Sequence, residues 1–230
     1  MRNRIARSTS LFLIAIFGIL SMVGSGGGGG GSPALPSDTV FLTQDPGLDQ
    51  PGDTQTFNLT GSATDNSVKI AITATITASR LANQMLNGEE VEVGEVVIVI
   101  NIPSQGSSVS SVGTSYISLD GVLRQSVDSD GVVCIPDAGF KPFPSSVMVG
   151  QSGNQGTLSC SDGGTETSTY LVETSTKNNQ WAAVREFSTS MSSGLSDIFV
   201  EIVTHITTDG RTRAIEAFVS DDTISFELTS

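Results

Sequence analysis

The sequence contains few of the residues that enzymes use to bind metals or attack substrates. Its 230 residues include one histidine, His205, and two cysteines, Cys134 and Cys160. Two thiols and one distant imidazole cannot complete the four-ligand set of a structural zinc site. One histidine without a positioned nucleophile and carboxylate makes no Ser-His-Asp triad, and the sequence has no G-x-S-x-G elbow. It therefore predicts no catalytic, cofactor-binding or metal-binding residue, and a protein that is not an enzyme.

Basic residues are also scarce. The chain has 11 Lys and Arg against 24 Asp and Glu, a formal net charge of −13 at pH 7. A strongly acidic chain repels the phosphates of nucleic acids and the anionic head groups of lipids. The composition therefore argues against both as partners, and it favours solubility outside the cytoplasm.

The amino terminus combines a basic head with a short apolar run. Arg2, Arg4 and Arg7 precede the apolar residues 11–23. This run is shorter than the roughly 20 residues of a membrane-spanning helix, and its pattern is typical of a secretory signal. We expect residues 1–25 to be a signal peptide and the protein to be exported, to the periplasm or the outer cell surface. An uncleaved N-terminal anchor is the alternative.

The end of this leader resembles a bacterial lipoprotein signal. Met22, Val23 and Gly24 precede Ser25, which stands where lipoproteins carry the acylated cysteine. A serine cannot form the thioether, so the leader is lipoprotein-like, and any membrane association is expected only through the N-terminus. Six glycines follow directly, and glycine-rich chains behave as flexible coils. We expect residues 26–53 to tether the folded part at a distance from a membrane surface.

The two cysteines form a candidate disulfide. Cys134 and Cys160 both follow the leader, and an even pair of cysteines in an exported chain is typical of a disulfide. Closing a loop of this length stabilises a fold by roughly 3 kcal/mol in the chain-entropy model. We expect a structural cross-link and no redox role.

Strand patterns dominate the rest of the chain. Residues 68–77 alternate between apolar and polar side chains, which predicts a strand with one buried face. Asp-Gly pairs within 116–127 and 199–219 predict two hairpins with tight turns. Only residues 79–88 have a spacing that suits a short helix or an irregular crossover. The expected fold class is all-β, with antiparallel meander sheets.

The two Asp-Gly hairpins suggest an internal duplication. Residues 115–124 and 204–213 share Ile, Asp, Gly and Arg at equivalent positions. We expect two related β units, 54–132 and 153–230, joined by a Pro-rich linker at 133–152. Any two Thr-rich β segments look alike, so chance similarity is the alternative.

Several of these features together resemble one group of proteins. They are the lipoprotein-type leader, the Gly-rich tail, the stretches "GVVCIPD" and "SSVMVGQSGNQGTLSCSDGGTETSTYLVE", and the Asp-Gly hairpins. The chain is similar in these features, over most of residues 50–228, to small uncharacterised bacterial envelope proteins. The resemblance implies an antiparallel β protein of the bacterial cell envelope. It carries no functional residues, and Ser25 is the departure from it.

Acidic residues are the remaining candidates for chemistry. Three clusters offer oxygens to calcium: Asp128 and Asp130 with Asp137, Asp162, and Asp221 with Asp222. Asp-rich turns between strands also occur for turn geometry alone. Two glutamate pairs, Glu89 with Glu90 and Glu173 with Glu186, are candidates for the paired acids of a glycosidase.

The expected function is that of a non-catalytic exported envelope protein. The leader, the tether and the disulfide predict a β module that binds, or forms a scaffold with, a protein or another envelope component. The alternatives are a carboxylate-based hydrolase of cell-surface polysaccharide and a calcium-stabilised adhesive module.

Overall fold

The structure is a computed structural model that describes residues 36, 38–43, 45–65, 67–191, 197–221 and 224–230. The leader, the polyglycine and Ser25 lie outside the described residues, as does Asp222. The described residues include no helix long and apolar enough to cross a lipid bilayer.

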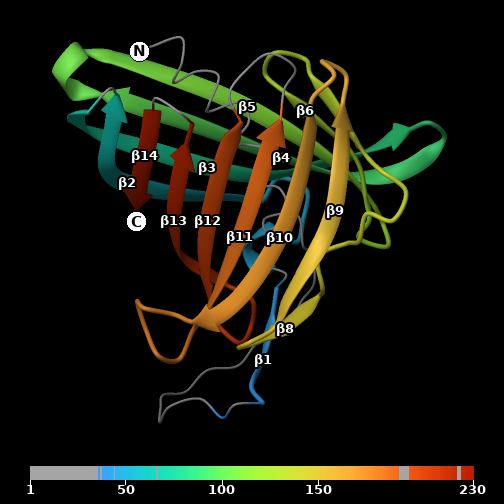
Figure 1. Ribbon diagram of the computed structural model, residues 1–230. Coiled ribbons are helices and arrows are strands. Elements are labelled where there is room, and N and C mark those ends of the chain that lie inside the picture. The colour runs from blue at the N-terminus through green and yellow to red at the C-terminus, as the bar shows by residue number, and fades with distance from the viewer. Residues whose placement is uncertain (1–35, 37, 44, 66, 192–196, 222–223) are drawn as a thin grey trace.

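Twelve antiparallel strands close into a barrel (Figure 1). They are β2 (Thr54–Asp65), β3 (Val68–Leu86), β4 (Glu89–Ile102), β5 (Ser107–Ser118), β6 (Leu123–Asp128), β7 (Val133–Pro136), β9 (Ser152–Cys160), β10 (Thr165–Thr174), β11 (Ala182–Met191), β12 (Ile198–Ile206), β13 (Thr212–Ser220) and β14 (Ile224–Thr229). Each pairs with the next in chain order, except that β7 pairs with β9, and β14 returns to pair with β2. The predicted all-β, antiparallel meander is confirmed.

The two predicted β units are contiguous parts of this barrel. Residues 54–132 supply β2–β6 and residues 153–230 supply most of β9 and all of β10–β14. The linker 133–152 contributes β7, which ends at Pro136, and β8 (Ser146–Met148). The duplication itself stays a prediction, because the closed barrel accommodates the strands with or without it.

A second, two-stranded sheet covers one end of the barrel, at the bottom of Figure 1. β1 (Val40–Leu42) pairs with β8, and Phe41 and Val147 pack against buried side chains near the ends of β10–β12. The adjoining turn, η1 (Pro46–Leu48), is held by Asp45, whose buried carboxylate accepts the Gly47 and Thr212 amides. β1 and η1, which precede the first barrel strand, and β8 of the linker therefore cover this end of the barrel.

One secondary-structure prediction is wrong. Residues 79–88 are neither a helix nor a crossover, because β3 runs to Leu86 and pairs with β4. Asn87 and Gly88 both have positive φ, of 52° and 87°, which makes a tight hairpin turn. The Asn-Gly pair was the signal for this turn. The Asp-Gly hairpins at Gly121 and Gly210 are confirmed, each glycine having a φ above 80°.

The barrel interior has an apolar side and a polar side. β2–β4 and β12–β14 fill their inner face with Ile, Val, Leu, Phe and Ala, such as Ile76, Ile98 and Ile202. The inner faces of β5, β6, β10 and β11 carry buried serines and glutamates instead. The predicted buried face of residues 68–77 is confirmed at Ile72, Ala74 and Ile76. A short turn, η2 (Pro103–Gln105), joins β4 to β5.

Candidate functional site

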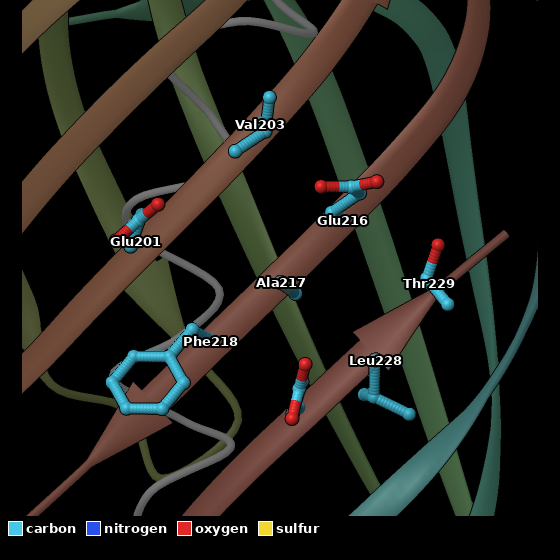
Figure 2. A pocket seen from close by; sticks show the side chains of 8 residues that line it. Glu201, Val203, Glu216, Ala217, Phe218, Leu228 and Thr229 are labelled. Atoms are coloured by element: carbon cyan, nitrogen blue, oxygen red, sulfur yellow. The ribbon is translucent and has the colours of Figure 1, made fainter. Parts of the chain in front are cut away.

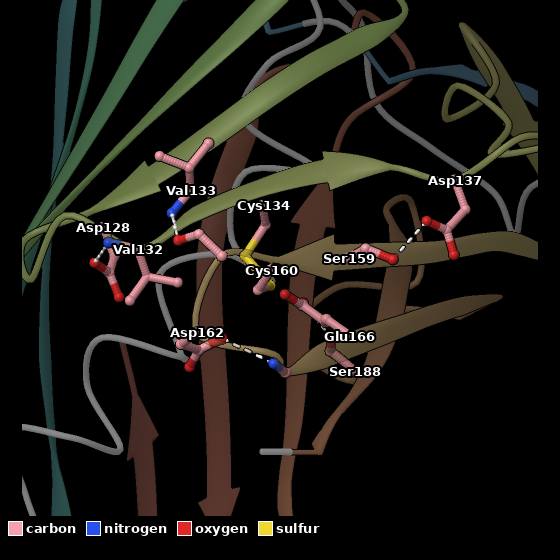
Figure 3. The surroundings of a disulfide bond; sticks show 12 residues. Asp128, Val132, Val133, Cys134, Asp137, Ser159, Cys160, Asp162, Glu166 and Ser188 are labelled. Atoms are coloured by element: carbon pink, nitrogen blue, oxygen red, sulfur yellow. Dashed lines mark hydrogen bonds between the residues drawn. A yellow bond between two sulfur atoms is a disulfide. The ribbon is translucent and has the colours of Figure 1, made fainter. Parts of the chain in front are cut away.

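The predicted disulfide joins Cys134 of β7 to Cys160 of β9, with an S–S distance of 2.05 Å and a Cα–Cα distance of 4.0 Å. The two residues are direct cross-strand partners, and Cys134 is fully buried. The bond therefore fastens the linker strand to the first strand of the second predicted unit. Figure 3 shows its surroundings, which include several acidic side chains.

Three of the aspartates proposed for calcium accept hydrogen bonds within the protein, Asp128 and Asp162 inside their own turns and Asp137 from a residue of β9. Asp128 Oδ1 accepts the amides of Asp130 and Val132, both at 2.9 Å. Asp162 Oδ1 accepts the Gly164 amide, and Asp137 Oδ1 accepts the Ser159 hydroxyl at 2.6 Å (Figure 3).

Burial, together with the nearby Asp130 and Asp162 charges, raises the pKa of Asp128. Within the described part of the chain, no three acidic, His or Cys side chains are grouped as metal ligands.

The glutamate pairs nominated from the sequence are not brought together as a catalytic pair. Glu173 lies on the outer face and bonds Arg185 at 3.0 Å, whereas Glu186 points into the barrel. Glu89 pairs with Arg124 at 2.9 Å, and Glu90 accepts the Asn83 amide at 3.0 Å.

The structure instead places Glu166 and Glu186 together inside the barrel. Glu186 pairs with Ile202, a residue of the apolar core, so Glu186 lies on the inner face. Glu166 pairs with Ser190, which is four residues after Glu186 on the same strand, so Glu166 lies on the inner face as well. They are 3% and 2% exposed. Figure 3 shows Glu166 near the disulfide, with Ser188, whose hydroxyl it accepts.

Burial makes both inner glutamates weak acids. It raises the pKa of Glu166 to about 7, against a smaller lowering from the Ser188 hydrogen bond. It raises the pKa of Glu186 well above its usual value, and the charge of Glu166 raises it further. Among the described residues, Glu166 Oε2 and Glu186 Oε1 find no hydrogen-bond partner. Burial therefore favours the neutral form of each carboxyl, because a buried charge without a partner is costly.

The only histidine lies on the outer face of β12, beneath the loop between β10 and β11. His205 is 1% exposed, and its Nδ1 is 2.7 Å from the Ser175 hydroxyl. Its Nε2 is 3.6 Å from Glu216 Oε1, which is too long for a hydrogen bond. Burial lowers the pKa of His205, although the charge of Glu216 opposes the effect, so the surroundings favour the neutral ring.

This Ser175–His205–Glu216 set contains the residue types of a hydrolytic triad, but its geometry is that of a loop anchor. Ser175 is buried, and its Oγ also accepts the Lys177 amide at 3.1 Å. It does not line the groove described next. The sequence did not reveal this set, because its members come from three separate segments: the loop after β10, β12 and β13.

A groove of about 480 Å³ crosses the outer face of β12–β14 beside this set (Figure 2). It is lined by Glu201, Val203, Glu216, Ala217, Phe218, Glu227, Leu228 and Thr229. Figure 2 shows the Phe218 ring nearly face-on at one end and the carboxylates of Glu201 and Glu216 further along. The groove therefore combines carboxylates with an exposed aromatic face.

Strand register produces this combination. Glu201 pairs directly with Phe218, and Phe218 pairs with Glu227 on the other side. Directly opposed residues of antiparallel strands place their Cβ atoms about 5 Å apart. The ring of Phe218 is therefore flanked by a carboxylate on each neighbouring strand.

Further aromatic rings extend the surface. Phe199 lies 6.3 Å from Phe218 and 6.2 Å from Phe187, measured between ring centroids. The outer face of β11–β13 thus carries a row of three phenyl rings beside the groove. No such row was predicted, because each phenylalanine sits in a different strand.

Two basic residues neutralise the groove only in part. Arg185 pairs with Glu201 and Glu173, and Lys177 pairs with Glu216 at 3.1 Å. Glu201, Glu216 and Glu227 line the groove, and Glu173 is the second partner of Arg185, so four carboxylates lie beside two cations. The local charge stays negative.

The fold and the groove together define a class: a closed antiparallel barrel, cross-linked by one disulfide, with an acidic aromatic groove on its outer wall. Comparison with known proteins adds no narrower identity, since no family model, curated protein or solved structure matches the chain.

Proposed function

We propose that this protein is a non-catalytic, exported envelope module that binds another envelope component through the groove on β12–β14. The leader pattern and the glycine tether support export and placement near a membrane. The Cys134–Cys160 bond supports an oxidising compartment. The resemblance to bacterial envelope proteins supports the periplasm or the outer cell surface.

One observation carries the binding role. Phe218 is 37% exposed at the end of a groove whose other outward side chains are mostly carboxylates. Exposed aromatic side chains beside polar groups are typical of interaction sites. The strands beneath are paired on both sides, so the groove is presented by a rigid wall.

The test is capture from envelope extract by the immobilised full chain, with matched variants. Phe218→Ala removes the ring from the groove. Ile135→Ala removes an exposed apolar side chain from β7, outside the groove. We expect a component that the wild type and Ile135→Ala retain and that Phe218→Ala loses. Equal retention by all three, or by none, would reject the groove as the binding surface.

A second candidate function is hydrolysis, favoured by the 2.7 Å contact between Ser175 and His205. The full chain would be exposed to a fluorophosphonate probe, with Ser175→Ala and Ser168→Ala as the test and control variants. Labelling that only Ser175→Ala abolishes would favour a hydrolase over the binding module. The binding proposal expects no labelling at Ser175, because its hydroxyl is buried and already bonded.

A further inference from the structure

Resting on the proposed function, we propose that the groove on β12–β14 recognises a guanidinium group, presented by an arginine-rich segment of the partner. The charge of the groove, the shape of its aromatic ring and a buried polar atom behind it together specify the chemistry of the partner.

Charge selects a cation. Glu201 and Glu216 each have a basic partner within the protein, but Glu227 lines the groove without a partner among the described residues. The chain as a whole carries a net charge of −13, so a second copy is repelled from this surface. A basic segment is attracted to it.

Shape selects guanidinium among cations. A planar guanidinium stacks on an aromatic ring and binds carboxylates in a bidentate manner, whereas an ammonium acts as a point charge. Phe218 offers its ring face, as Figure 2 shows, and has Glu201 and Glu227 as its two cross-strand neighbours. A guanidinium over the ring would therefore reach a carboxylate on either side.

The buried histidine provides an independent indication of a ligand. His205 Nε2 has no hydrogen-bond partner among the described residues, although the side chain is 1% exposed. It faces Glu216, a lining residue of the groove, at 3.6 Å. Buried polar atoms without partners are rare and call for an explanation. The wall behind the groove therefore contains a buried polar atom that no described residue satisfies, next to a carboxylate that lines the groove.

The test is calorimetric titration of the full chain with a hexaarginine peptide at pH 7 and low salt. Phe218→Leu keeps apolar bulk but removes the ring, and Glu227→Gln removes one carboxylate. Glu90→Gln removes the same charge from β4, outside the groove. We expect Phe218→Leu and Glu227→Gln each to weaken binding at least fivefold, and Glu90→Gln to change it less than twofold.

Two results would overturn the inference. One is equal weakening by Glu90→Gln and Glu227→Gln, which would indicate diffuse attraction to an acidic protein. The other is that hexalysine binds as tightly as hexaarginine and that Phe218→Leu does not weaken its binding. That result would show that the planar guanidinium group is not what the groove recognises. Absence of peptide binding alongside Phe218-dependent capture from envelope extract would refute the arginine partner alone and leave the proposed function standing.

Discussion

Glutamates occupy both faces of the wall formed by β10–β14, and the two sets lie in different surroundings. Glu166 and Glu186 point into the barrel, where burial favours their neutral forms. Glu201, Glu216 and Glu227 line the groove on the outer face, where water and two basic side chains accompany them. The same residue type therefore affects stability on one face and recognition on the other.

This contrast follows from the pleat. Successive residues of a strand point to opposite faces, so one strand can present a buried acid and an exposed one. Each face can then be changed by mutation without altering the other.

The largest effect is expected from cutting the cross-link that lies on the inner face. Cys134→Ala with Cys160→Ala should lower the free energy of unfolding by roughly 3 kcal/mol, because the unfolded chain regains the entropy of a closed loop. The outer-face comparison is Arg185→Met, which removes ion pairs worth less than about 1 kcal/mol. Urea unfolding measures both, and similar losses in the two variants would contradict the comparison.

The inner acids should make stability depend on pH. Glu166 has its pKa raised from 4.5 to about 7 in the folded state, so the folded protein binds more protons than the unfolded chain between these values. Its contribution to stability is complete below pH 4.5 and is lost as the pH rises through 7. From pH 5 to pH 8 the loss should be about 2 to 3 kcal/mol.

Glu166→Gln isolates this contribution, because it removes the titrating group and keeps the shape. The difference between wild type and variant in urea unfolding should change with pH by that amount. Glu227→Gln serves as the outer-face control, because it removes one carboxyl without touching the barrel interior. A profile that Glu166→Gln does not alter would place Glu166 in contact with water.

Replacing the second inner acid by an apolar residue should stabilise the protein. Glu186→Met removes a buried carboxyl whose Oε1 has no partner among the described residues. Substituting such a group by an apolar one of similar volume is expected to add about 1 to 2 kcal/mol at pH 8. Thermal unfolding measures the gain, and a lower midpoint would show that Glu186 has a bonding role inside the barrel.

The smallest effect is expected at the groove. Glu227→Gln should change the free energy of unfolding by less than about 0.5 kcal/mol, as is usual for exposed side chains. The measurement is again urea unfolding, at pH 7. A loss of 2 kcal/mol would show that the carboxylate supports the sheet and would weaken its assignment to recognition.

Sequence patterns predicted the local structure well and the long-range structure poorly. The alternation in β3 and the Asp-Gly turns are properties of neighbouring residues, so they were visible. Closure of the barrel depends on β14 pairing with β2, and no local pattern specifies a contact between segments that far apart. The short helix or irregular crossover predicted at 79–88 was wrong because a weak apolar spacing was given more weight than the Asn87-Gly88 turn.

The candidate site was hidden for a related reason. β10 has polar residues on both faces, so its sequence pattern indicates no buried face. Glu166 could therefore not be distinguished from an exposed acidic residue. The groove takes its lining from three strands, β12, β13 and β14, each of which contains only one glutamate. Only the register that sets Glu201, Phe218 and Glu227 side by side makes them a site.

The separation of the two faces is tested most directly by one series of melting curves at pH 7, with and without hexaarginine. Glu186→Met should raise the midpoint of unfolding and keep the upward shift that the peptide causes in the wild type. Glu227→Gln should keep the wild-type midpoint and lose most of that shift. If Glu186→Met abolishes the peptide effect, or Glu227→Gln retains it in full, then stability and recognition do not reside on opposite faces of this wall.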